Sequence, residues 1–154
     1  MSEVARLVDL LQSTFEGNPW HGDSVQAILK GVTSAHAVQK PLPNAHSIWE
    51  LVLHMAIWKD VARWRLELSE RQPTDEENFP FVADTSSAAW ERAKQRLVQA
   101  HRALCDAVAQ MPENRLAEEI PAGGGLAHYA RLHGVIHHDL YHAGQIAILK
   151  KAFA

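Results

Sequence analysis

The sequence predicts an all-α protein, a four-helix bundle with a long crossover between its first two main helices. Four stretches of the 154-residue chain repeat apolar residues at the three- and four-residue spacing of amphipathic helices. Glycine and proline separate these stretches, and no segment shows an alternating strand pattern of comparable strength. With 47% hydrophobic residues, the chain can build one continuous core. We therefore expect residues 1–154 to form a single domain of the four-helix-bundle type.

The first helix is expected over residues 3–16, because Gly17 and Pro19 follow its last apolar position. Its apolar residues recur at helical spacing: Val4, Leu7, Val8, Leu11 and Phe15. The next segment, residues 18–44, holds a helical piece around residues 24–30 and then two prolines. This segment is therefore expected to be the long, structured crossover between the first and second main helices.

The second helix is expected over residues 47–70, and Ser47 with Glu50 forms a capping-box pattern at its start. One face of this helix carries an apolar stripe that includes one histidine: Leu51, His54, Trp58, Val61 and Leu68. The polar residues 71–84, with two prolines, predict a loop.

The third helix is expected over residues 86–111, before Pro112. Its stripe is Trp90, Ala93, Leu97, Leu104, Val108 and Met111. The fourth helix is expected to run to about residue 152, because a last apolar stripe repeats at helical spacing. That stripe is Leu132, Val135, Ile136, Ala143, Ile146 and Leu149.

Composition argues against several classes of partner. The net charge of −3 and the pI of 6.3 provide no basic surface for nucleic acid. No apolar run reaches the roughly 20 residues that cross a bilayer, and the N-terminus does not resemble a signal peptide. The single cysteine, Cys105, excludes an internal disulfide and a thiolate metal site. We therefore expect a cytoplasmic protein that binds neither nucleic acid nor membrane.

Ten histidines are the unusual feature of this composition, and two His-x-x-x-His pairs place rings on one helical face each. Spacing alone is weak evidence, since about 0.6 such pairs would arise by chance from ten histidines in 154 residues, so the face that each pair occupies on the helical wheel decides between them. On a wheel of 100° per residue centred on Val135, His138 and His142 lie on the apolar side. His133 and His137 lie on the opposite side.

Two inward-facing imidazoles are costly to bury unless a partner accepts their lone pairs, and a shared cation is such a partner. His54 lies in the middle of the second helix's apolar stripe and supplies a third ring. Three neutral imidazoles can hold one Zn²⁺, Ni²⁺ or Fe²⁺ per chain and leave positions for water or substrate. The sequence thus predicts a metal site at His54, His138 and His142.

Two segments carry a family resemblance: His46-Ser-Ile-Trp-Glu-Leu-Val-Leu-His54 and Gly134-Val-Ile-His-His-Asp-Leu-Tyr-His-Ala-Gly-Gln-Ile146. They resemble the DinB-like superfamily, which includes YfiT-type proteins assigned as metal-dependent hydrolases and bacterial thiol S-transferases. The resemblance implies a bundle with a long first crossover, a homodimer, and metal ligation by the helix-two histidine and the helix-four pair. These map onto His54, His138 and His142.

Asp139 and Glu50 are the candidate catalytic residues. Asp139 falls beside His142 on the wheel, where it could accept a hydrogen bond from a ligand ring or be a solvated carboxylate. Glu50 lies one turn before His54, where it could act as a general base, although the capping box already explains it. Tyr141 and Gln145 could line the opening or make surface or dimer contacts.

The remaining histidines and the cysteine are expected to lie in the core or at the surface, with weaker links to the metal site. His101 points along the third helix's apolar stripe and could be a fourth ligand or a pocket wall. Cys105, one turn later, is expected to be a small core residue. The others lie near loops or helix ends and are expected to be exposed: His21, His36, His46 and His128. Of these, His46 could approach the mouth of the site.

Two functional hypotheses from different classes follow. The first is a metal-dependent enzyme whose ion activates either water for hydrolysis or a small thiol for transfer to an electrophile. The sequence lacks the Glu of the H-E-x-x-H motif, which disfavours peptide hydrolysis by that mechanism. The second is a non-catalytic metal-binding or stress-response module, in which the ion ties the second and fourth helices together. A bundle whose histidines bind no metal is a third interpretation.

Overall fold

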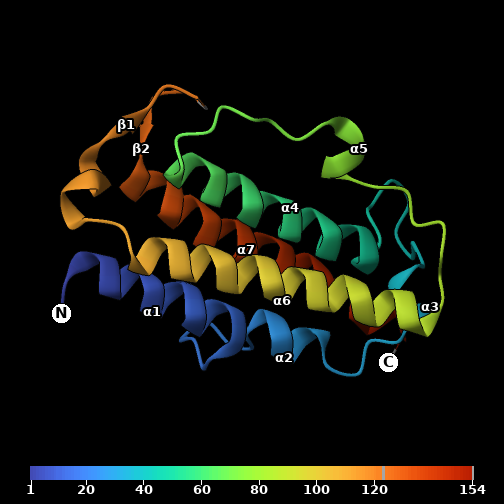
Figure 1. Cartoon of the computed structure of the whole chain (residues 1–154). Coiled ribbons are helices and arrows are strands. Elements are labelled where there is room, and N and C mark those ends of the chain that lie inside the picture. The colour runs from blue at the N-terminus through green and yellow to red at the C-terminus, as the bar shows by residue number, and fades with distance from the viewer. Residues whose placement is uncertain (123, 154) are drawn as a thin grey trace.

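Four long helices lie side by side in the computed structural model, which describes residues 1–122 and 124–153 (Figure 1). They are α1 (Glu3–Glu16), α4 (Ile48–Leu66), α6 (Ser87–Ala109) and α7 (His128–Lys150). Helices α6 and α7 each pack against both α1 and α4. The predicted all-α bundle is confirmed, and α4 and α7 are neighbours in it.

Helix α1 has the predicted bounds. Its N-terminus is capped by Ser2, whose Oγ accepts a hydrogen bond from the backbone N–H of Ala5 at 3.2 Å. Gly17 ends the helix, and its backbone N–H donates to Gln12 and Ser13. A Cβ atom at Gly17 would lie 2.8 Å from the Cα of Ser13, so the chain turns here through a space that only glycine fits.

The crossover contains the predicted helical piece as α2 (Val25–Leu29) and a second short helix, α3 (Ser34–Ala37), that the sequence did not predict. Helix α2 packs mainly against α1 and α7. Lys150, at the end of α7, donates hydrogen bonds to the carbonyl oxygens of Ile28 and Lys30 at 2.9 and 2.7 Å. These bonds satisfy free carbonyls at the end of α2 and fix the crossover to α7.

Helix α4 ends at Leu66, four residues before the predicted end. The placement of Leu68 on the apolar face was wrong: it has a φ of 60° and is 66% exposed. The reason is Arg65, which is buried and donates from Nη1 to the carbonyl oxygens of Ser69 and Arg71 at 2.5 and 2.9 Å. These bonds draw the chain back around the guanidinium and terminate the helix.

The predicted polar loop after α4 holds one helical turn, α5 (Asp75–Asn78). Thr74 and Glu77 form a capping box around it, with reciprocal hydrogen bonds of 3.1 and 3.0 Å. Figure 1 shows α5 lying over α4, and the two helices are in contact. This turn brings the loop onto the face of α4 that carries His54.

The segment between α6 and α7 holds a 3₁₀ helix (Glu113–Ala117) and two antiparallel strands, β1 (Glu119–Ile120) and β2 (Leu126–Ala127). A second 3₁₀ helix, Lys151–Phe153, follows α7. None of the helices in the described residues is long and apolar enough to cross a membrane.

His128 corrects a sequence expectation, since it is fully buried rather than exposed. It begins α7 directly after β2, and its backbone N–H donates to Glu118 at 3.1 Å. Its ring Nε2 lies 3.4 Å from Nη2 of Arg115. The small sheet and the 3₁₀ helix therefore cover a helix end that would otherwise face solvent.

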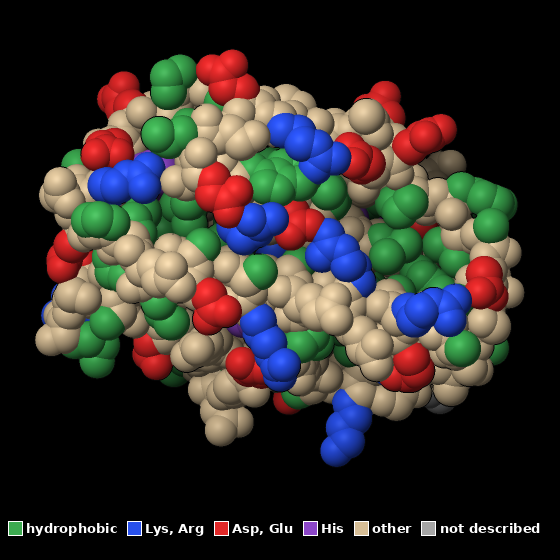
Figure 2. Space-filling model, in the orientation of Figure 1, with side chains coloured by type: hydrophobic (Ala, Val, Ile, Leu, Met, Phe, Trp, Pro, Cys, Tyr) green, Lys and Arg blue, Asp and Glu red, His purple; other side chains and the backbone are tan. Residues whose placement is uncertain are grey.

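The core is formed by two apolar clusters, one around Trp49 and Trp90 and one around Leu7 and Leu104. Trp90 also donates from its indole nitrogen to the Val32 carbonyl at 2.8 Å, which holds the crossover against α6. On the face drawn in Figure 2, acidic and basic side chains are interspersed.

Candidate metal centre

Three histidine rings meet between α4 and α7. His54 comes from α4, and His138 and His142 come from adjacent turns of α7. Nε2 of His138 lies 3.1 Å from Nε2 of His54 and 3.0 Å from Nε2 of His142. One ligand atom from each ring lies within 4.8 Å of the others. The structure thus brings together the three residues that the sequence predicted.

A main-chain carbonyl fixes the tautomer of His54. Its Nδ1 lies 3.1 Å from the carbonyl oxygen of Asn78, at the end of α5. Because that oxygen can only accept, Nδ1 carries the ring proton and Nε2 presents a lone pair to the cluster. The Asn78 side chain also accepts a hydrogen bond from Trp58 Nε1 at 2.9 Å, which holds the loop in place.

The side chain of Gln145 fixes the tautomer of His142. Its Oε1 accepts a hydrogen bond from His142 Nδ1 at 2.7 Å, which leaves the lone pair on Nε2. Orienting partners on the far nitrogen are usual for histidines that bind metal. The sequence analysis does not predict this contact, although the position of Gln145 three residues after His142 places both on one helical face.

The donor set fits a cation. Two Nε2 atoms with lone pairs face the Nε2 of His138, and a proton on that nitrogen can satisfy only one of them. Burial lowers the pKa of His54 and His142, and burial with the two neighbouring rings lowers the pKa of His138 to about 3. The rings are therefore neutral at physiological pH, the state in which imidazole binds a metal ion.

Aromatic rings enclose one side of the cluster. Phe79 stacks on His54 at a centroid distance of 4.2 Å, and His46 stacks on Phe79 at 3.7 Å. Tyr141 lies edge-on to His142 at 5.0 Å and is 65% exposed. His46 is also exposed, as expected, so these two residues flank the cluster where it meets solvent.

Directly behind the cluster lies a buried ion pair that the sequence analysis missed. Lys59 Nζ donates to Asp139 Oδ2 at 2.5 Å, and both side chains are 1% exposed. Asp139 does lie on the inner side of α7, but its partner is Lys59 rather than a ligand ring. The pair joins the same two helices that carry the three histidines.

The Glu50 carboxylate caps the start of α4 and pairs with Lys40. Its carboxylate accepts from the Ser47 backbone at 2.7 Å, in the predicted capping box, and from Lys40 Nζ at 2.8 Å. Burial raises the pKa of Glu50, but the hydrogen bonds from Lys40 and Ser47 outweigh it and lower the pKa overall. A carboxylate held this way is a poor proton acceptor.

His101 lies outside the cluster. Its ring stacks on Phe15 at 4.0 Å, and its Nε2 lies 3.4 Å from Cys105 Sγ. Burial, with a contribution from Lys59, lowers its pKa to about 3. Cys105 is a buried core residue, as predicted, and burial raises its pKa to about 11. The inference that His101 could be a fourth ligand is not supported by this geometry.

The outer histidine pair is also separate. His137 is exposed and His133 is half-buried on the side of α7 away from the cluster, beside Tyr129. His21 is exposed, whereas His36 is half-buried because its ring stacks on Phe153 at 4.7 Å. The wheel assignment of the two His-x-x-x-His pairs is confirmed.

The fold and the cluster together define a class: an all-α bundle whose candidate metal site is built from side chains on two facing helices. The family is shown by comparison of sequences. The chain belongs to the DinB superfamily, whose family model matches residues 20–146. Comparisons with curated proteins and with solved structures found no match.

Proposed function

We propose that the chain binds one divalent first-row metal ion through Nε2 of His54, His138 and His142. The observation that carries this proposal is the convergence of three neutral imidazole nitrogens, two of which have their tautomers fixed by Asn78 and Gln145. Neutral imidazole suits Zn²⁺, Ni²⁺ and Fe²⁺. Membership of the DinB superfamily agrees with this assignment.

Protein purified without an affinity tag or chelator is expected to carry close to one such ion per chain, because the buried lone pairs otherwise lack partners. Elemental analysis measures the content directly. The same sample should be stripped, reloaded with Zn²⁺ and with Ni²⁺ in turn, and dialysed. Retention of neither ion would contradict the proposal.

We further propose that the site is catalytic, of the hydrolase or the thiol S-transferase class, and acts on a small-molecule substrate. A bound divalent ion would lower the pKa of a water or thiol that joins it. Three protein ligands leave coordination positions free, and His138 is partly exposed. The alternative is a structural ion that links α4 to α7, favoured by the burial of His54 and His142.

Neither acid that the sequence suggested is placed to act on substrate. Asp139 is fully buried in its pair with Lys59, and Glu50 is held by Lys40 and the helix cap. The exposed ring of His46 lies across Phe79 from His54. Its Nδ1 lies 3.6 Å from Glu50, and it stacks on the same phenylalanine as His54.

The two roles of the ion are separated by adding a small thiol to Co²⁺-substituted protein. A catalytic site is expected to admit the thiol, so the visible spectrum gains an absorption from a new sulfur-to-cobalt bond. The His142→Ala variant serves as the control, since it should lack the parent spectrum. An unchanged wild-type spectrum would favour the structural ion and remove the support for a thiol transferase.

A further inference from the structure

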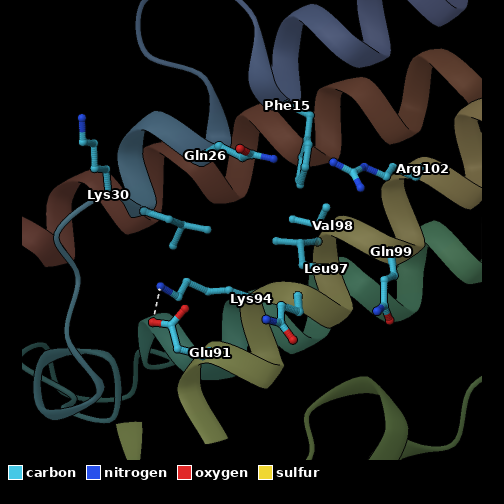
Figure 3. A pocket seen from close by; sticks show the side chains of 11 residues that line it. Phe15, Gln26, Lys30, Glu91, Lys94, Leu97, Val98, Gln99 and Arg102 are labelled. Carbon is cyan, nitrogen blue, oxygen red and sulfur yellow. Dashed lines mark ion pairs between the residues drawn. The ribbon is translucent and has the colours of Figure 1, made fainter. Parts of the chain in front are cut away.

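A hollow that is separate from the histidine cluster lies between α2 and α6. Because the short helix α2 packs mainly against α1 and α7, a cavity of about 500 Å³ remains beside α6 (Figure 3). This volume is in the range of pockets that hold small molecules. Its lining comes from α1, α2 and α6, and none of its residues belongs to the histidine cluster.

The floor of this hollow is apolar and is held in place by the core. Val98 and the edge of Leu29 form the accessible apolar surface, and Phe15 and Leu97 lie almost completely buried beneath it. The ring of His101 stacks on Phe15 at 4.0 Å and helps to hold it in place. The floor therefore offers a ligand a rigid apolar surface, and burying an alkyl chain there is favourable.

The rim is cationic. Lys30, Lys94 and Arg102 line the hollow, against one acid, Glu91, which is paired with Lys94 at 2.7 Å. Within the described residues Lys30 and Arg102 form no ion pair. A further acid, Glu16, lies just outside the lining and accepts a 3.4 Å hydrogen bond from Gln26. The lining itself thus carries three cationic side chains against one acid.

The arrangement along α6 indicates the shape of the ligand. Figure 3 shows Arg102 and Gln26 extending toward Phe15 from opposite sides, whereas Lys94 points to Glu91 at the other end of the hollow. Lys94 and Arg102 are eight residues apart, or about 12 Å along the helix, and the apolar floor lies between them. A guanidinium binds a carboxylate through two parallel hydrogen bonds.

We propose that this hollow binds a medium-chain alkyl carboxylate, with the carboxylate at Arg102 and the chain over Phe15, Leu97 and Val98. The pocket is separate from the histidine cluster, so this inference stands or falls independently of the proposed metal chemistry. Such a site would take a free fatty acid or a similar aliphatic acid as its ligand.

Octanoate titrated into the zinc-loaded protein is expected to bind one per chain and to shift the backbone NMR signals of Leu29, Leu97 and Val98. Affinity should rise by roughly fourfold for each added CH₂ from hexanoate upward, and should level off when the chain fills the hollow. Uncharged 1-octanol should bind at least about tenfold more weakly, because it lacks the charge-assisted bonds to Arg102.

Arg102→Gln should weaken octanoate binding by about tenfold or more. The matched control is Arg92→Gln, an exposed arginine of the same helix that pairs with Asp84 outside the hollow. It should bind octanoate like the wild type. His142→Ala should also bind normally, which separates this site from coordination of the carboxylate by the metal.

Three results would overturn the proposal. The first is octanoate binding that is lost in His142→Ala but kept in Arg102→Gln. The second is no octanoate binding while the protein sediments with anionic phospholipid vesicles, which would mean a lipid surface instead. The third is no octanoate binding with a change of oligomeric state in Arg102→Gln, which would mean that a second copy covers the hollow.

Discussion

Replacing His54, His138 or His142 by alanine is expected to abolish tight metal binding. Each ring supplies one of only three nitrogens, and two of the rings are more than 90% buried. The loss of affinity should exceed the roughly 10- to 100-fold that follows from removing a hydrogen-bond partner of a ligand. Competition with a chromophoric chelator measures the affinity of each variant for Zn²⁺.

The chain provides a matched control for this series. His133 and His137 are also two histidines four residues apart in α7, but they lie on the face opposite the cluster. The variants His133→Ala and His137→Ala therefore remove histidines that are not expected to bind metal. Both variants should bind Zn²⁺ as the wild type does. Equal loss of affinity in all five variants would show that the cluster is not the site.

Breaking the buried pair of Lys59 and Asp139 is expected to have the largest effect on stability. Either Lys59→Met or Asp139→Leu leaves one buried charge without its partner, at a cost of about 3–5 kcal/mol in the free energy of unfolding. The double variant should recover most of this loss, because two apolar side chains of similar size can replace a buried ion pair. Urea denaturation of the metal-free proteins measures all three.

An exposed pair calibrates the result. Arg63, in the last turn of α4, forms a solvent-accessible i,i+4 ion pair with Glu67, which follows the helix, and removing it should change the unfolding free energy by less than about 1 kcal/mol. If Lys59→Met lowered the free energy of unfolding no more than Arg63→Met does, the buried ion pair would contribute no more to stability than a surface ion pair. If the double variant were as unstable as the single ones, the apolar replacement argument would be wrong.

The histidine cluster was predictable because its signal is local. Helical periodicity around Val135 places His138 and His142 inward and His133 and His137 outward. The apolar stripe of the second helix, read from the same helical period, places His54 inward as well. The bounds of α1 were predictable for the same reason, with Gly17 as a clear stop signal. Family membership agrees with what these periodic patterns indicate.

The parts that sequence reasoning missed depend on contacts between distant segments. Lys59 resembles a solvated residue until Asp139, 80 positions away, is placed against it. The end of α4 was set too late because Arg65 binds carbonyls beyond the helix, which no propensity reveals. His128 was expected at the surface because the small sheet that covers the start of α7 has only two residues in each strand.

The contact between His54 and the carbonyl of Asn78 has a consequence for how this protein can evolve. A main-chain carbonyl is chemically the same whichever side chain is attached to it. Residues of the loop after α4 whose side chains do not hold the loop, unlike Asn78 and Phe79, can therefore drift in identity while His54 keeps its proton on Nδ1. Insertions and deletions are different, because a change of one residue in the length of that loop would move another part of the chain against the ring. Selection on this loop should act on its length and path more strongly than on its composition.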